Sequence, residues 1–452
     1  MTDFRIEKDS MGDVRVPADK LWGAQTQRAV ENFPVSGRPI PPRMIHAFGR
    51  VKRAWAVVNR ERGALGQEAA DAIVRAAEEV AAGAWDDQFP VDVFQTGSGT
   101  SSNMNANEVI ANRAIQTLGG EVGSRHPVHP NDHVNQGQSS NDVVPTVIHM
   151  AAAEAFTRDL IPALKELAAA LEAKAEAFDG VVKIGRTHLM DAVPVRLGQE
   201  FSGYARQVRN AVRRVEGTLP SLCELALGGT AVGTGLNAPE GASEAVIAIL
   251  AAEAGLPFVQ APNLFEALAC RDALVEASGA LRTVAVSLTK IAEDVRWLGS
   301  GPRTGIGEVV IPDLQPGMME EMLLQVCAQV MGNDQAVAIS GQWGHFELNT
   351  MMPVMAANLL DSAALLANGC RAFASKCVAG LEADEARCRE LVERSLALVT
   401  ALNPVIGYDA AAAVAKEAHA TGRTLREICL EKGLLSEAQL DELLDARRMT
   451  GP

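Results

Sequence analysis

Long stretches of the chain carry hydrophobic residues at intervals of three and four positions, with polar residues between them. This spacing places the hydrophobic side chains on one face of an α-helix. Four stretches show it most clearly, at residues 150–171, 197–219, 274–298 and 348–377. Several of these patterns are longer than a usual globular helix, so they predict a mainly α-helical protein built around a long helix bundle.

The stretch at 274–298 has near-heptad spacing, but its outer positions hold mostly Ala, Val and Ser instead of charged residues. A helix with such a surface is covered on more than one side. In a bundle of this length, that coverage indicates packing between subunits, and we expect an obligate oligomer.

Changes in composition divide the chain into three expected domains. Residues 1–138 mix short helical patterns with Gly, Pro and Asn, which indicates an N-terminal, mostly helical domain with many loops. Residues 139–385 hold the long helices of the central bundle, and residues 386–452 form a small helical C-terminal domain. In that last domain, Ser436 precedes a helical pattern and is expected to be its N-cap.

Composition agrees with long helices and narrows the choice of partner. Hydrophobic residues make up 48% of the 452 residues and aromatic residues only 4%, a balance typical of Ala- and Leu-rich helices. The net charge of −15 argues against a nucleic acid or an acidic membrane as partner. The sequence shows neither a signal peptide nor an apolar stretch of membrane-spanning length, so we expect a cytoplasmic protein. Seven scattered cysteines without a CxxC pair fit that compartment.

Two polar segments precede long helical patterns and suggest the chemistry. They are residues 139–142 (Ser-Ser-Asn-Asp) and residues 185–188 (Gly-Arg-Thr-His). Backbone N–H groups at a helix N-terminus bind anions, and the imidazole of His188 can exchange protons near neutral pH. Together they suggest proton transfer on a small carboxylic acid. The alternative is that residues 139–142 only cap a helix and that His188 is an ordinary loop histidine.

Two glycine-rich segments can bring backbone close to a ligand, because glycine lacks a Cβ. Residues 97–101 (GSGTS) lack the lysine of a phosphate-binding loop and do not match GxGxxG, so a plain polar loop remains an alternative. Residues 228–237 contain too much glycine for a helix interior. We expect this second segment to lie near a site, in company with Asn141 and His188.

Three histidines have a spacing that invites a metal site: His126, His129 and His133. However, Pro127 and Pro130 prevent a regular helix from aligning the imidazoles, and no second ligand cluster accompanies them. We therefore expect no metal ion, and residues 129–132 can equally be a simple turn.

Taken together and in this order, these segments resemble the fumarase/aspartase superfamily, and within it the class II fumarate hydratases. The resemblance covers nearly the whole chain, from residues 20–28 (KLWGAQTQR) to residues 398–403 (LVTALN). Aspartate ammonia-lyases typically have Gln in place of His188 and Ser-Thr-Asn in place of residues 139–141. Both differences favour the fumarases.

The resemblance implies a fold and an activity. The fold is a mainly α, three-domain fumarase/aspartase-like fold, with a twenty-helix core in a homotetramer whose active sites each draw on three subunits. The activity is the reversible hydration of fumarate to (S)-malate through an aci-carboxylate intermediate, without a metal or another cofactor. An aspartate ammonia-lyase-like enzyme and a catalytically silent oligomeric scaffold are the alternatives.

The resemblance also implies roles for individual residues. The substrate carboxylates would be held by Ser98, Gly99, Thr100, Ser139, Ser140, Asn141 and Thr187. His188 would transfer the proton of the attacking or leaving water, with Glu321 as its acidic partner. A secondary dicarboxylate site would consist of His129, Pro130, Asn131 and Asp132. Many relatives have Arg where this chain has His126, so the second site lacks the cation that those relatives have there.

One segment departs from the family pattern. After Pro316 and Gly317 the family has a Gly-Ser-Ser loop that continues through Met, Pro, Lys and Asn and supplies a serine base. Here Gly317 leads directly to Met318, so the chain is shorter by about ten residues in this motif. Either the printed sequence omits a mobile loop, which we favour because the rest of the site is complete, or the loop is deleted and activity is nearly abolished.

Overall fold

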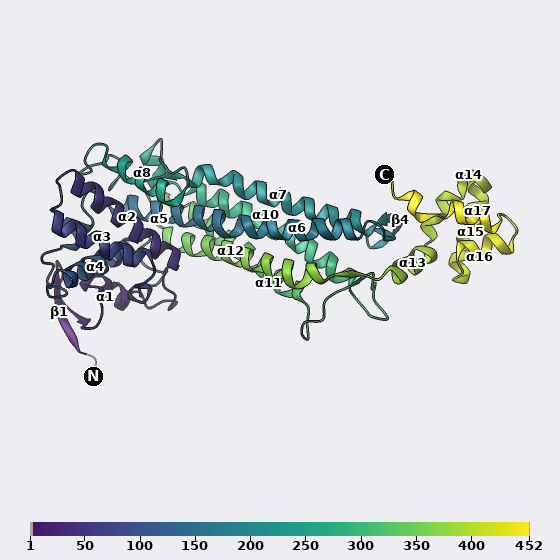
Figure 1. Ribbon diagram of the computed structural model, residues 1–452, viewed down its shortest axis with the longest axis horizontal. Helices are drawn as coiled ribbons and strands as arrows, with labels where there is room; N and C mark the ends of the chain where they lie inside the picture. The colour runs from purple at the N-terminus through teal and green to yellow at the C-terminus, as the bar shows by residue number, and fades with distance from the viewer. Residues whose placement is uncertain (1–2, 452) are drawn as a thin grey trace. The chain divides into compact units, whose positions relative to one another are not determined.

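The computed structural model describes residues 3–451, and helices dominate it (Figure 1). The chain divides into two compact units. Unit 1 consists of Met1–Ile161, Arg213–Thr283 and Ala328–Leu366, and unit 2 consists of Pro162–Val212, Val284–Cys327 and Ala367–Pro452. The division into three domains, at residues 138 and 385, stays a prediction.

The mainly α-helical fold is confirmed, and the long helices lie close to their expected positions. They are α6 (Ile161–Ala177), α7 (Leu197–Leu222), α10 (Asp272–Leu298), α11 (Met319–Gly341) and α12 (Met352–Ala372). The stretch at 150–171 is divided between α5 (Ser140–Ala155), a π-turn at Phe156–Leu160 and α6.

One helix begins later than the hydrophobic spacing predicts. Leu348 belongs to strand β9 (Leu348–Asn349), and α12 begins only at Met352. The side-chain carbonyl of Asn349 accepts a hydrogen bond from the Met351 N–H at 2.9 Å. Asparagine favours such a local side-chain bond over a helical position, which explains the later start.

Unit 1 also contains the helices α1 (Ala24–Asn32), α2 (Pro42–Glu61), α3 (Gln67–Ala81), α4 (Thr100–Thr117), α8 (Ala242–Ala254) and α9 (Leu264–Ala269). Helices α2, α3, α4 and α5 pack against one another (Figure 1). On α2, Phe48 and Val51 are fully buried, and burial of each such side chain stabilises the fold by about 1.5–3 kcal/mol.

The strands of unit 1 are short. β1 (Phe4–Asp9) and β2 (Gly12–Pro17) form an antiparallel hairpin, β5 (Glu224–Leu225) pairs in parallel with β6 (Val259–Gln260), and β8 (Gly344–His345) pairs with β9.

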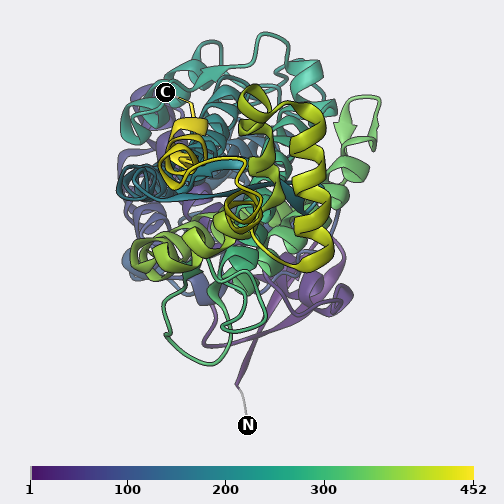
Figure 2. The ribbon, with the colours of Figure 1, turned by 90° about the vertical axis from the view of Figure 1, so that its right-hand side faces the viewer.

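Unit 2 contains an antiparallel hairpin and the C-terminal helices. The hairpin strands are β3 (Val182–Thr187) and β4 (Met190–Arg196), and a second short pair joins β7 (Val309–Val310) to β10 (Glu382–Ala383). The helices are α13 (Glu385–Arg394), α14 (Asn403–Ile406), α15 (Tyr408–Thr421), α16 (Leu425–Glu431) and α17 (Glu437–Leu443), drawn in yellow-green to yellow in Figure 2. Ile184 of β3 shares a buried core with Leu398, Val414 and Ile428. Ser436 caps α17, as predicted, in a capping box with Gln439.

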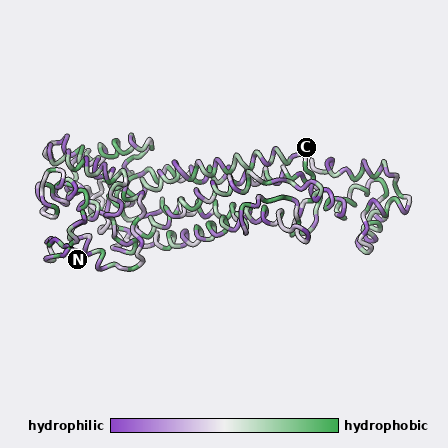
Figure 3. The backbone as a smooth tube through the Cα atoms, turned by 60° about the horizontal axis from the view of Figure 1, so that its bottom comes forward, coloured by the Kyte–Doolittle hydropathy of each residue, from purple (hydrophilic) through white to green (hydrophobic). Residues whose placement is uncertain are grey.

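Hydrophobic and hydrophilic positions alternate along the helices, as the periodic sequence pattern predicts (Figure 3). Within residues 3–451, no helix has both the length and the apolar character that crossing a membrane requires. All seven cysteines are free thiols, and only Cys270 is partly exposed.

Candidate active site

The first residues of two helices meet in unit 1. Helix α4 begins at Thr100 and α5 begins at Ser140. The Thr100 Oγ1 lies 2.9 Å from the Ser140 Oγ and 2.7 Å from the Ser98 Oγ. N–H groups in the first turn of a helix lack partners within the helix, and the helix dipole adds positive potential there. The two helix ends therefore form a position suited to a carboxylate.

Glycine is required where the chain approaches α4. A Cβ on Gly97 would lie 1.6 Å from the carbonyl oxygen of Thr350, which is far closer than van der Waals contact allows. Gly99 has a φ of +72°, and a Cβ there would lie 2.8 Å from the side chain of Val144. These glycines therefore allow α4 to begin directly against α5 and the segment before α12. Gly97 and Gly99 thus bring the backbone close to Thr350 and Val144, which are other parts of the protein.

Asp142 connects the start of α5 to the glycine-rich segment at 228–237. The Asp142 side chain is fully buried, and one of its oxygens accepts the N–H of Ser139 at 3.0 Å. The other oxygen accepts the N–H groups of Gly228 and Thr230, each at 3.0 Å. Burial raises the pKa of Asp142, while these three hydrogen bonds oppose the rise.

Asn141 reaches the same glycine-rich segment, because its side-chain amide donates to the carbonyl oxygen of Ala231 at 2.8 Å. The Ser139 Oγ accepts the Asn141 N–H at 3.2 Å and completes a capping box at the N-terminus of α5. The capping interpretation is therefore confirmed, and residues 228–237 lie beside Asn141 as expected. Their expected nearness to His188 stays a prediction. A capped helix end remains compatible with anion binding, since side-chain hydroxyls and further N–H groups are still present.

Lys52 belongs to this region, although the sequence pattern did not single it out. Its side chain is fully buried on α2, and its Nζ donates to the Asn135 Oδ1 at 2.8 Å and to the Gln138 Oε1 at 3.0 Å. Lys52 thereby supports the segment that leads into α5. The available signal was a lysine on the hydrophobic face of a helix, beside Val51 and Trp55.

Replacing Lys52 with Met is expected to flatten the pH dependence of stability. Burial lowers the Lys52 pKa from 10.5 to about 7, so between these values the unfolded chain binds this proton and the folded chain does not. Stability of the unsubstituted protein therefore rises with pH across this window, by at most about 1.4 kcal/mol per pH unit. Urea unfolding followed by circular dichroism at several pH values should show this rise, and K52M should lack it. The exposed residue Lys8 provides the control K8M, which should keep the rise; an unchanged slope in K52M would contradict the prediction.

Residues 129–132 are not a simple turn, because His129 is the N-cap of a short π-helix at Pro130–Val134. The His129 Nδ1 lies 3.3 Å from the Asn131 N–H and 3.1 Å from the Asp132 N–H. The Asp132 carboxylate lies 3.2 Å from the same nitrogen. Pro130 is buried, whereas Asn131 and Asp132 are exposed. Across residues 3–451, no group of three or more His, Cys, Asp or Glu side chains is arranged to hold a metal ion.

Thr187 and His188 lie at the tip of the β3–β4 hairpin in unit 2. Strand β3 ends at Thr187 and β4 begins at Met190, which leaves His188 and Leu189 as a two-residue turn. Their φ angles are +55° and +60°, as a type I′ turn requires. Side chains other than glycine rarely adopt this conformation, and such strain is concentrated at functional sites. The turn leaves His188 exposed.

A cluster of buried charges supports the base of this hairpin. Arg186 donates to both carboxylate oxygens of Glu308, each at 2.9 Å. The Lys183 Nζ lies 3.3 Å from Glu308 and 3.2 Å from Glu200. Glu308 is 0% exposed and Lys183 is 1% exposed. The bidentate pair fixes the direction of Arg186, which immediately precedes Thr187.

Glu321 lies in the first turn of α11 and is exposed. It accepts a hydrogen bond from Arg296 at 3.4 Å. The neighbouring Glu320 is buried, and its Oε1 lies 3.3 Å from the Cys377 Sγ. The structure thus pairs Glu321 with Arg296, whereas Ser98, Thr100 and Ser140 are joined by hydrogen bonds in the other unit. Asn141 lies in that other unit as well. Thr187 and His188 belong to the same unit as Glu321.

Comparisons with known proteins agree with the resemblance seen in the sequence. A family model described as lyase matches residues 12–332, and one described as the fumarase C C-terminus matches residues 398–451. The class II fumarate hydratase of Ralstonia nicotianae is 54% identical over 457 residues, which covers 99% of each chain. The chain belongs to the class II fumarate hydratase family.

Two further proteins extend the comparison. The mitochondrial fumarate hydratase of Saccharomyces cerevisiae is 53% identical over 465 residues, covering 100% of this chain and 95% of the yeast protein. The crystal structure of the recombinant class II fumarase of Schistosoma mansoni has a TM-score of 0.94 at 39% identity and covers 100% of both chains. Because these relatives are fumarate hydratases or fumarases, they do not favour an aspartate ammonia-lyase.

The alignment with the yeast fumarate hydratase is longer than this chain. It spans 465 residues, whereas this chain has 452 and is covered completely. The yeast protein therefore contains residues without a counterpart here. The sequence indicates a shortening after Gly317, and α11 begins only two residues later, at Met319.

Proposed function

We propose that this protein catalyses the reversible hydration of fumarate to (S)-malate. The observation that carries the proposal is the meeting of the α4 and α5 N-termini through the hydroxyls of Ser98, Thr100 and Ser140. This donor-rich position occurs in a chain that is 54% identical to a class II fumarate hydratase over nearly its full length. It suits one carboxylate of a small dicarboxylate.

The carboxylates of the substrate bind, in this proposal, to residues that different subunits contribute. These residues are Ser98, Gly99, Thr100, Ser139, Ser140, Asn141 and Thr187. Removal of a proton beside a carboxylate places a second negative charge on that group. Donors that are already oriented where this charge develops stabilise the transition state without reorganisation. The capped and glycine-supported start of α5 is a rigid arrangement of that kind.

His188 transfers the proton of the water that is added or lost. Its exposed imidazole stands on a two-residue turn, and imidazole is suited to proton transfer near neutral pH. Glu321 acts as its acidic partner; its carboxylate accepts a 3.4 Å hydrogen bond from Arg296, which can be exchanged. We also propose His129, Pro130, Asn131 and Asp132 as a secondary dicarboxylate site.

We further propose that the protein is a homotetramer in the cytoplasm, with each active site built from three subunits. Within α10, Val286 and Trp297 are 54% and 53% exposed on the single chain. Large hydrophobic side chains on the surface of a long helix favour burial against another subunit. A shared site would also allow the N-termini of α4 and α5 in one subunit to meet the His188 turn of another.

The hydration activity of the 47.8 kDa protein tests the proposed function. The rate is followed by loss of fumarate absorbance and by identification of (S)-malate. Because the sequence lacks the loop that supplies a serine base in the family pattern, the rate should be about 10²–10⁴-fold lower than that of relatives that have this loop. Absence of any hydration, or release of ammonia from aspartate instead, would contradict the proposal.

A further inference from the structure

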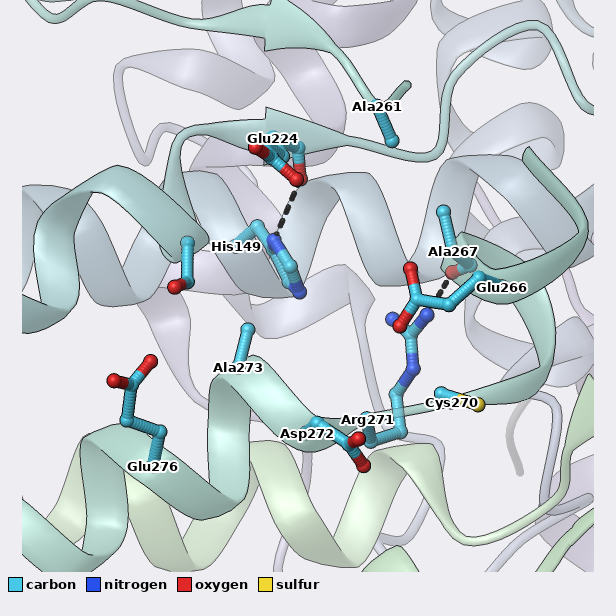
Figure 4. Close-up of a pocket in the computed structure, with 11 residues that line it drawn as sticks. His149, Glu224, Ala261, Glu266, Ala267, Cys270, Arg271, Asp272, Ala273 and Glu276 are labelled. Carbon is cyan, nitrogen blue, oxygen red and sulfur yellow. Dashed lines mark hydrogen bonds between the residues drawn. The ribbon is translucent and has the colours of Figure 1, made fainter. Parts of the chain in front are cut away.

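A cavity of about 440 Å³ lies in unit 1, and none of its lining residues belongs to the proposed active site (Figure 4). It is bounded by α5, the end of α7, β5, α9 and the start of α10. The side chains that matter for its chemistry are His149, Glu224, Glu266, Arg271, Asp272 and Glu276. Its walls therefore carry several charged side chains among apolar ones, and the neighbouring core cluster is hydrophobic.

Arg271 is the strongest indication that this cavity binds a ligand. Its side chain is only 2% exposed, and one of its terminal nitrogens donates to the carbonyl oxygen of Ala267. The Nε and Nη1 have no hydrogen-bond partner. Glu266 lies beside the guanidinium in Figure 4 but does not supply an acceptor to either nitrogen. Since an unpaired buried donor on a charged group is costly, these two nitrogens call for an anionic oxygen.

His149 requires a hydrogen-bond donor from the ligand, whereas Arg271 requires an acceptor. Its Nδ1 lies 2.9 Å from the carbonyl oxygen of Glu224, which can only accept, so this nitrogen carries the proton. Burial lowers the His149 pKa to about 3, which keeps the ring neutral. The Nε2 is then an acceptor, and it is buried without a partner. Figure 4 shows this nitrogen on the side of the ring that faces away from Glu224. It calls for a donor such as an ammonium or a hydroxyl group.

The carboxylates around the cavity favour an ammonium group over a hydroxyl group as the donor to His149. Glu224, Glu266, Asp272 and Glu276 line the cavity together with the single cation Arg271. Their combined negative potential repels a purely anionic ligand and attracts an ammonium group. A purely cationic ligand, in turn, would leave the N–H groups of Arg271 without an acceptor.

We propose that this cavity binds a free α-amino acid, whose carboxylate accepts from Arg271 and whose ammonium group donates to His149 and the nearby carboxylates. A volume of about 440 Å³ leaves room for a side chain beyond these two groups. The proposal does not depend on the reaction at the active site. It explains why a charged residue is kept in a buried position with two unused donors.

The stability of an Arg271→Met variant tests whether Arg271 is there for a ligand. Methionine retains the hydrophobic stem and removes an unpaired buried charge, a change that is often neutral or stabilising. We therefore expect R271M without ligand to melt at the same temperature as the unsubstituted protein or higher. A marked decrease in Tm would assign Arg271 a purely structural role and overturn the proposal.

Isothermal titration calorimetry of the assembled protein with each standard amino acid tests binding directly. We expect at least one to bind, and R271M to weaken that binding about 10- to 100-fold. The control R62M alters an exposed arginine of the same unit and should bind normally. Inorganic phosphate and propylamine present only an anionic or only a cationic group and should bind weakly or not at all. Fumarate hydration by R271M without amino acids should be unchanged, which separates this test from that of the proposed function.

Several results would overturn the inference. They are absence of binding by any amino acid, equal binding by R271M, or equal binding of phosphate. A change in oligomeric state of R271M, measured by size-exclusion chromatography with light scattering, would also overturn it. That outcome would mean that a side chain of a second copy fills the cavity.

Discussion

Replacing His188 with Asn should lower the turnover of fumarate hydration by about 10²–10⁴-fold, the usual contribution of a general acid or base. Asparagine is the informative substitution because the φ of residue 188 is +55°, and Asn tolerates the left-handed conformation of a type I′ turn. The hairpin should therefore keep its geometry while the proton-transferring group is lost. Steady-state kinetics should show the loss mainly in kcat, with a smaller change in KM.

The same turn provides a matched control. Leu189 also has a positive φ, at +60°, and it is 78% exposed. A Leu189→Asn variant changes the same hairpin by the same type of residue but leaves the imidazole in place, so it should remain active. Light scattering should show the same oligomer for both variants. Near-normal turnover in H188N would show that His188 does not transfer the proton.

The helices could be predicted from the sequence because their hydrophobic positions recur over many turns. Val284, Leu288 and Ile291 of α10, for example, are all fully buried or nearly so, as their spacing predicts. The spacing does not say which other element covers a hydrophobic face. For the same reason it could not predict that Leu348 would join a two-residue strand, since that choice depends on its pairing with His345.

The polar segments of the site could also be recognised from the sequence. The distant residues that hold these segments in place by hydrogen bonds could not. Residues 139–142 have the composition of a helix cap, and that local role is visible in the sequence. The hydrogen bonds from Gly228 and Thr230 to Asp142 join residues almost ninety positions apart. Lys52 reaches Asn135 and Gln138 across a similar separation. Such contacts are set by how helices pack, and no local pattern encodes them.

The second large effect is expected at Glu308, whose ion pairs hold the hairpin that carries His188. Replacing Glu308 with Gln should destabilise the protein by about 3–5 kcal/mol, because removing one member of a buried ion pair leaves the other charges uncompensated. Glu308 is 0% exposed and is shared by Arg186 and Lys183. Glutamine has almost the same shape, so the loss would come from charge and not from packing. Urea unfolding at fixed protein concentration would measure it.

Glu390→Gln is the matched control for this substitution. Glu390 also contacts two cations, Arg387 and Arg394, at 2.8 and 3.2 Å, but its side chain is 48% exposed. Exposed ion pairs contribute only about 0–1 kcal/mol, so E390Q should unfold almost like the unsubstituted protein. Equal stability of E308Q and E390Q would show that the buried cluster does not support unit 2.

E308Q should also reduce hydration activity, although Glu308 itself touches no substrate in the proposed mechanism. Arg186 is adjacent in sequence to Thr187, and its bidentate pair with Glu308 orients the end of β3. Without that pair the turn that carries His188 becomes less ordered. The kcat of E308Q should therefore fall even without urea and at a temperature where E308Q is folded. Adding Arg186→Met to E308Q removes one of the uncompensated charges, and the double variant should therefore be more stable than the sum of the two single effects predicts. If E308Q recovered stability but not activity in that double variant, the orienting role of Arg186 would be separated from its contribution to folding.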